Sequence, residues 1–131
     1  MTVVIPEELL APLRDGLFFD LYVQVEEASA LIDPRKRGNI GGEVRACLAR
    51  ANRTRALLDV VGWVEPVEVP TAVEVDARKH REALLRTLLA RIESEHGIEE
   101  DPEASDEARA AAKARIGQLT DLIVGVEEAG S

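Results

Sequence analysis

The stretch LLAPLRDGLFFDLYVQVEEASALI, residues 9–32, repeats apolar side chains at steps of three and four positions. Such spacing gives one continuous apolar stripe along an α-helix. Residues 6–8, Pro-Glu-Glu, suit the first turn, where proline fits and acids favour the positive end of the helix dipole. The Asp33-Pro34 pair ends the pattern, because the residue before a proline avoids helical geometry. The sequence therefore predicts a helix over residues 6–32. Its stripe consists of Leu10, Leu13, Leu17, Leu21, Val25, Ala28 and Ile32.

Three more helical patterns follow, separated by polar or proline-containing segments. We predict these helices over residues 43–61, 72–96 and 102–127. Gly62 is placed to cap the second helix in a left-handed conformation. Thr71 and Glu74 have the spacing of a capping box, which predicts the start of the third helix there. The fourth helix begins either at Asp101 or at Ser105, since both side chains can cap a helix.

The segments outside these helices are predicted to be extended or polar. Residues 64–70 contain two prolines and alternate apolar with polar positions, which favours an extended connector. An alternative is a short strand in this connector that pairs with residues 2–5. The third helix is expected to end at residues 96–98, His-Gly-Ile, where glycine can terminate it. The sequence as a whole predicts one all-α domain over residues 1–131, a four-helix up-down bundle.

Composition narrows the class of protein further. Apolar residues make up 46% of the 131 positions, but aromatic residues only 3%, which suits close packing of aliphatic helices. Cys47 is the single cysteine and lies on a helical stripe, so we expect a buried, inert thiol and no disulfide. No secretory signal or membrane-spanning run is evident, which predicts a cytoplasmic protein. A net charge of −9 argues against binding to nucleic acid or to an anionic membrane.

Aromatic side chains are concentrated on the first predicted helix. Phe18, Phe19 and Tyr22 are three of the chain's four aromatic residues. At 100° per residue they point in different directions, so one helical core is not expected to cover them all. Exposed apolar surface of this kind commonly marks an interface. We therefore predict a homodimer through the first helix, with Trp63 as a further contact; the alternative is that the connector covers this surface.

Charge is segregated along the chain. Residues 35–55 contain seven basic residues and one acid, whereas residues 91–107 contain eight acids and one arginine. The basic segment starts in a glycine-rich loop before a helix, where free backbone donors can bind an anion. Possible anion contacts are therefore Arg35, Lys36, Arg37 and Arg45. The overall negative charge makes nucleic acid an unfavourable partner.

Metal binding has weak support in the sequence. Glu93 and His96 have the Glu-x-x-His spacing of di-iron helical bundles, but the second such pair that those sites need is missing. Asp76 and His80 are four residues apart and could also share a metal. Because a closed site needs three or four converging ligands, we predict neither a metal nor another cofactor.

No motif in the sequence identifies a function. The sequence offers no catalytic residue, which favours a role other than catalysis. The leading hypothesis is a protein-interaction module that dimerises through its first helix. One alternative is an enzyme or small-ligand binder, with or without a metal, whose site lies inside the bundle. The second alternative is anion or nucleic-acid binding through residues 35–55.

Overall fold

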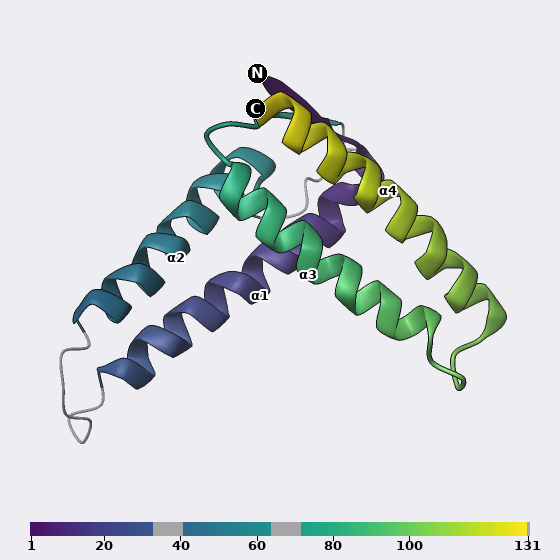
Figure 1. The fold of residues 1–131 in the computed structure, drawn as a ribbon, viewed down its shortest axis with the longest axis horizontal. Helices are drawn as coiled ribbons and strands as arrows, with labels where there is room; N and C mark the ends of the chain where they lie inside the picture. The colour runs from purple at the N-terminus through teal and green to yellow at the C-terminus, as the bar shows by residue number, and fades with distance from the viewer. Residues whose placement is uncertain (33–40, 64–71, 131) are drawn as a thin grey trace.

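The described residues of the chain form four helices and a two-stranded sheet (Figure 1). The computed structural model describes residues 1–32, 41–63 and 72–130. The elements, in chain order, are β1 (Thr2–Ile5), α1 (Glu7–Leu31), α2 (Gly41–Val61), β2 (Val73–Asp76), α3 (Arg81–Glu99) and α4 (Asp106–Gly130). The predicted all-α class with four helices is therefore confirmed.

The helices form two antiparallel pairs, α1 with α2 and α3 with α4 (Figure 1). The pairs meet where α1 crosses α3, and their far ends diverge from this crossing. Up-down packing of all four helices in a single bundle is therefore not confirmed. β1 lies beside the C-terminal part of α4, where Gly125 approaches the side chain of Val3.

The core gathers around the crossing and beneath the small sheet. Its largest fully buried apolar side chains are Ile5, Leu9, Leu17, Leu57, Leu58, Val75, Leu84, Leu88, Leu119 and Val126. Every helix and both strands contribute, so no element can leave without exposing apolar surface. The predicted stripe of α1 is only partly buried. Its middle, including Leu13 and Leu17, packs in the core, whereas Val25 and Ile32 remain exposed.

The predicted start of the third helix is wrong. Residues 73–76 form β2, which pairs antiparallel with β1 so that Val3 faces Val75, and α3 begins only at Arg81. Alternating valines favour a strand when one face is buried, and Val75 is buried while its neighbours are not. The proposed capping box therefore caps no helix. Asp76 instead accepts hydrogen bonds from the backbone N–H groups of residues 78 and 79, in the turn that precedes α3.

The alternative of a strand in residues 64–70 that pairs with residues 2–5 stays a prediction. Residues 64–71, which include the whole of that connector, lie outside the described part of the chain. Among the described residues, the partner of β1 is β2, which follows that connector in the chain.

Of three other helix ends, two agree with the prediction from the sequence and one does not. Gly62 has φ 94° and its N–H donates to the carbonyl of Leu58 at 2.8 Å, so it caps α2 as predicted. At α4 the second of the two predicted starts is correct, because Ser105 Oγ accepts a hydrogen bond from the N–H of Ala108 at 3.1 Å. The predicted end of α3 at Gly97 is wrong, since that helix continues to Glu99.

Gly16 allows α1 to approach α3 closely. A Cβ added at this position would lie 2.8 Å from Cγ2 of Thr87, on the opposite helix. Thr87 is almost fully buried, and a β-branched side chain on a helix has few other rotamers. The distance between the two helices at their crossing therefore depends on the missing side chain.

We expect Gly16→Ala to lower the free energy of unfolding by about 1 kcal/mol, because steric overlap outweighs the helix propensity gained. In a Thr87→Ser background, which removes Cγ2 and keeps the hydroxyl, the same change should become stabilising. Urea unfolding of the four proteins at one concentration measures both effects. A destabilisation of equal size in both backgrounds would show that Thr87 is not the obstructing group.

Candidate functional site

One side of α1 presents apolar side chains to solvent. Phe18 is 38% exposed, Phe19 69%, Tyr22 59% and Val25 48%. The opposite side of the same helix packs on α2 and α3, and the core covers no more than about half of its circumference. We call these four residues the aromatic face. The expectation that the first helix leaves aromatic surface exposed is confirmed; its use as an interface stays a prediction.

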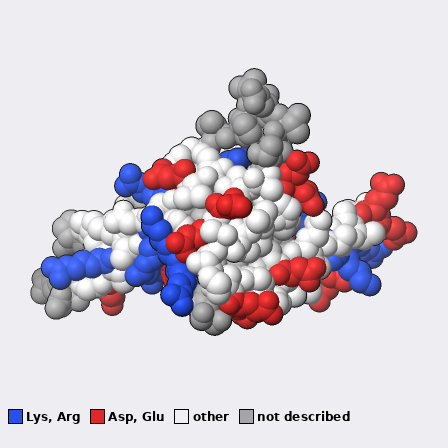
Figure 2. Space-filling model, turned by 90° about the horizontal axis from the view of Figure 1, so that it is seen from above, with Lys and Arg blue, Asp and Glu red and all other residues white. Residues whose placement is uncertain are grey.

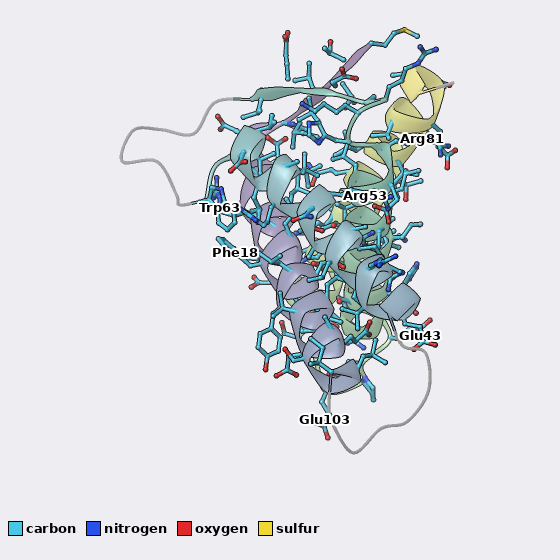
Figure 3. All side chains as sticks on the ribbon, turned by 90° about the vertical axis from the view of Figure 1, so that its left-hand side faces the viewer. Phe18, Glu43, Arg53, Trp63, Arg81 and Glu103 are labelled. Atoms are coloured by element: carbon cyan, nitrogen blue, oxygen red, sulfur yellow. The ribbon has the colours of Figure 1, made fainter. Side chains whose placement is uncertain are left out.

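Trp63 extends the aromatic face beyond α1. Its indole ring lies edge-on to Phe18, with ring centroids 5.7 Å apart and an angle of 62° between the planes. Figure 3 shows the two side chains next to each other on one side of the molecule. Trp63 Nε1 also donates a hydrogen bond to Asp59 at 2.7 Å, which fixes the ring at the end of α2. An edge-to-face pair of this kind holds both rings in one orientation.

Tyr22 keeps its polar end at the surface. Its hydroxyl donates a hydrogen bond to Glu26 Oε1 at 2.7 Å. This hydrogen bond, together with the negative charge of the carboxylate, raises the pKa of Tyr22 above its ordinary value. The phenol therefore stays protonated and remains a hydrogen-bond donor at neutral pH.

A groove of about 360 Å³ lies between α1 and α3, next to the aromatic face. Gly16, Phe19 and Val23 form its wall on α1, and Ala90 and Ser94 lie on its α3 side. Phe19 belongs to both the groove and the aromatic face. Charged or polar residues complete the lining: Asp15, Asp20, Thr87 and Arg91. The groove is thus largely apolar, with a few polar groups at its edges.

A polar network joins three helices at the groove. The guanidinium of Arg86 on α3 binds both carboxylate oxygens of Asp20 on α1, at 3.0 and 2.8 Å. Thr54 on α2 lies between them, its hydroxyl oxygen 2.6 Å from Asp20 and 2.9 Å from Arg86. Burial alone would raise the pKa of Asp20, but the hydrogen bonds from Arg86 and Thr54 outweigh it and hold the pKa below its ordinary value. This network orients the helices around the groove.

Thr87 has an unusual environment beside this network. Its hydroxyl oxygen is buried and has no hydrogen-bond partner within the described residues. A buried polar group without a partner is costly, and native proteins rarely keep one without a reason. Thr87 lines the groove, but its hydroxyl oxygen is not exposed to it.

The predicted metal ligands do not form a site. The carboxylate of Asp76 is engaged by backbone N–H groups, and His80 is buried at the start of α3, where burial is the main cause of a lowered pKa. Glu93 and His96 are exposed on α3, and His96 Nδ1 lies 3.5 Å from Glu99 instead. Across the described residues, no three His, Cys, Asp or Glu side chains are placed to hold one ion. Cys47 is buried, as expected.

The predicted anion contacts are only partly described. Arg45 is exposed on α2, whereas Arg35, Lys36 and Arg37 lie outside the described residues. Figure 2 shows basic side chains toward the α2 end of the molecule, and acidic ones gathered at the α3–α4 turn beside a few basic ones. The charge segregation noted in the sequence is thus also a separation in space.

Several buried polar residues were not recognised from the sequence. Arg14 is 7% exposed and caps the end of α2, with Nε 2.9 Å from the carbonyl oxygen of Gly62 and Nη2 3.3 Å from that of Val61. Glu95 is fully buried between α3 and α4 and accepts hydrogen bonds from Arg91 and Arg115. Nothing in the local sequence separates these residues from solvated charges, because their partners come from distant segments.

Comparison with known proteins does not assign the chain to a family. No protein-family model, curated protein or solved structure matches this chain. Within the described residues, none of the helices is long and apolar enough to cross a membrane. A functional proposal therefore has to rest on the geometry of the aromatic face and the groove.

Proposed function

We propose that this protein is an interaction module that forms a symmetric homodimer through the aromatic face of α1. The observation that carries the proposal is the row of exposed apolar side chains on one helix, continued by Trp63. Large apolar groups kept together in water on a folded protein favour association. The buried, single cysteine agrees with the reducing interior of a cell, and we place the protein in the cytoplasm.

The size of the surface supports a protein partner. The exposed parts of four aromatic side chains, Phe18, Phe19, Tyr22 and Trp63, amount to roughly 400 Å². This is about half of the ~800 Å² that each partner buries in a stable interface. The rings are also fixed in place, Trp63 by two contacts and Tyr22 by its hydrogen bond. Fixed rings lose little conformational entropy on binding, so more of the apolar contact contributes to affinity.

A second copy of the chain is the occupant that we favour. A two-fold axis across α1 brings one aromatic face against the same face of the partner, so a single patch serves both sides. The two acids flanking this patch, Asp15 and Glu26, are eleven positions apart, and an axis at Phe19 keeps them away from each other. The opposite charges at the two ends of the molecule would then help to set the orientation.

Sedimentation velocity over a concentration series tests the proposal. We expect the wild type to be a dimer, and we expect Phe19→Glu and Tyr22→Glu each to raise the dimer Kd at least about 10-fold, because a charge would be buried in an apolar contact. Leu89→Glu is the matched control. Leu89 is 56% exposed but lies on α3, outside the aromatic face, so its replacement should leave the Kd unchanged.

Two results would contradict the dimer. A wild-type protein that remains monomeric at the highest concentrations would remove the proposed function. Equal losses from Leu89→Glu and Phe19→Glu would show that the interface is not the aromatic face. Circular dichroism of each variant confirms that the helices are retained.

A further inference from the structure

One edge of the small sheet is open. Among the described residues the sheet has two strands, so β1 pairs with β2 on one side and with no strand on the other. The N–H of Ala77 donates to the carbonyl of Met1 at 2.9 Å, so these two residues form a hydrogen-bonded pair at the end of the ladder. In an antiparallel pair, only alternate residues turn their backbone groups toward the partner strand. The N–H and C=O groups of Thr2 and Val4 therefore point away from β2.

The outward backbone groups of β1 are unpaired. Within the described residues, neither Thr2 nor Val4 has a hydrogen-bond partner on this side. Natural sheets protect such an edge with charged side chains, a proline or a bulge. The four residues of β1, Thr-Val-Val-Ile, carry no charge, and the side chains of Thr2 and Val4 are exposed. The edge is thus a free row of donors and acceptors at the spacing of another extended backbone.

A groove of about 330 Å³ lies between this open edge and α4. It touches both Val3 and Val4, whose side chains point to opposite faces of the sheet, so it lies at the edge and not on one face. Its other wall is the C-terminal part of α4, which contacts β1 and lies next to it in Figure 1. We call this space the edge groove.

The edge groove has an apolar floor and acidic sides. Leu9 and Leu122 form the floor. Glu8 on α1 and Asp121 on α4 are exposed, and neither has an ion-pair partner within the described residues. None of the described residues that line the groove is basic. Because unpaired carboxylates attract cations, and the net charge of −9 adds to their field, the groove favours a positively charged occupant.

We propose that the open edge of β1 binds an extended, basic peptide segment of another protein, which adds a third strand to the sheet. Main-chain hydrogen bonds to Thr2 and Val4 supply affinity in this mode of recognition, and alternate side chains supply specificity. Side chains on the α4 side of the added strand contact the floor of the edge groove, and a lysine or arginine among them pairs with Asp121 or Glu8.

The inference does not depend on the proposed dimer. The edge groove touches the start of α1, whereas the aromatic face begins at Phe18, more than two helical turns farther along the helix. The two surfaces therefore leave each other free.

A second copy of the chain is a poorer occupant of the edge groove. Its β1 has β2 on one side and α4 close to the other, so pairing two open edges would bring the two α4 helices against each other. The acidic sides of both grooves would also meet, and like charges across an interface are repulsive. A single extended segment with positive charge meets neither obstacle.

Val4→Pro tests the main-chain contact directly. Proline removes the outward N–H of Val4 and no hydrogen bond to β2, which is the position where a strand tolerates proline. The probe is a fluorescein-labelled octapeptide, TVTKTVTK, whose valines and lysines share one face when it is extended. By fluorescence anisotropy we expect the wild type to bind it with a Kd of about 100 µM or lower, and Val4→Pro to raise that Kd at least about 10-fold. Val4→Thr keeps the N–H and should bind like the wild type.

A charge exchange tests the preference for a basic peptide. Asp121→Lys should raise the Kd for TVTKTVTK and lower the Kd for TVTETVTE, each by about 3-fold. Glu103→Lys is the matched control. It makes the same change of charge at an exposed acid between α3 and α4, outside the edge groove, and should alter neither Kd by more than about 1.5-fold.

Amide hydrogen exchange followed by NMR locates the bound peptide. In the free protein the N–H groups of Val3 and Ile5 should exchange slowly and those of Thr2 and Val4 rapidly, and the peptide should slow only the latter two. Unchanged exchange at Thr2 and Val4, or equal Kd values for Val4→Pro and the wild type, would overturn strand addition. The same conclusion would follow if neither peptide bound at about 1 mM. A wild-type oligomer that Val4→Pro dissociates would assign the edge to a second copy instead.

Discussion

Replacing Asp20 with alanine is expected to lower the free energy of unfolding by about 3 kcal/mol. Asp20 neutralises Arg86 through two hydrogen bonds and accepts a third from Thr54, and the Asp20 side chain is only 14% exposed. Its removal leaves a guanidinium among three helices without its main partner. An uncompensated charge in such a place costs more than the pair itself contributes. Urea unfolding at a fixed protein concentration measures the loss.

Two further variants show whether the loss of stability comes from the ion pair between Asp20 and Arg86. Arg86→Met should also be destabilising, while the double variant Asp20→Leu with Arg86→Met should recover most of the loss, because both charges are then gone. Arg53→Met is the matched control. Arg53 belongs to the same cluster, but within the described residues its ion pair is an exposed contact with Glu82 at 3.7 Å, so its replacement should cost no more than about 0.5 kcal/mol. Strictly additive losses would show that Asp20 and Arg86 act separately.

The dependence of stability on pH provides a second test of the Asp20 carboxylate. Its pKa in the folded protein is lowered from 3.8, so the folded state binds this proton less tightly than the unfolded chain does. The resulting stability is complete above the ordinary pKa and disappears as the pH falls through and below it. The wild type should therefore lose more stability than Asp20→Asn when the pH falls below about 4.

The helices could be predicted from the sequence because their signals are local. Periodic apolar residues identified all four, and Gly62 and Ser105 marked two of the ends. The start of α3 was missed for a physical reason. Thr71 and Glu74 have the spacing of a capping box. Val73 and Val75, however, bury more apolar surface when their segment pairs with β1. That competing partner lies some seventy residues earlier, beyond any local pattern.

The candidate site was predictable only in part, for the same reason. Phe18, Phe19 and Tyr22 stood out because aromatic residues are scarce and cluster on one helix. The groove did not stand out, since it exists only where α1 crosses α3. Asp20 and Arg86 look like ordinary surface charges in the sequence, and their pairing is a consequence of that crossing.

Arg14 links the stability of the fold to the aromatic face, and its replacement should have the second-largest effect. It reaches from α1 to the last carbonyl groups of α2, where its positive charge also meets the negative end of the helix dipole. These hydrogen bonds hold Gly62, the residue immediately before Trp63, and Trp63 packs on Phe18. The guanidinium therefore positions a ring of the proposed interface without belonging to it.

We expect Arg14→Met, which keeps the aliphatic stem, to lower the free energy of unfolding by about 2 kcal/mol, because a charged donor leaves two carbonyls unsatisfied. Arg55→Met, at an exposed arginine of α2, should change stability by less than about 0.5 kcal/mol. Trp63 is the single tryptophan, so its fluorescence reports the end of α2 directly. In folded Arg14→Met the emission should shift to longer wavelength and the dimer Kd should rise. Lower stability with unchanged emission and Kd would mean that Arg14 supports the fold but does not position Trp63.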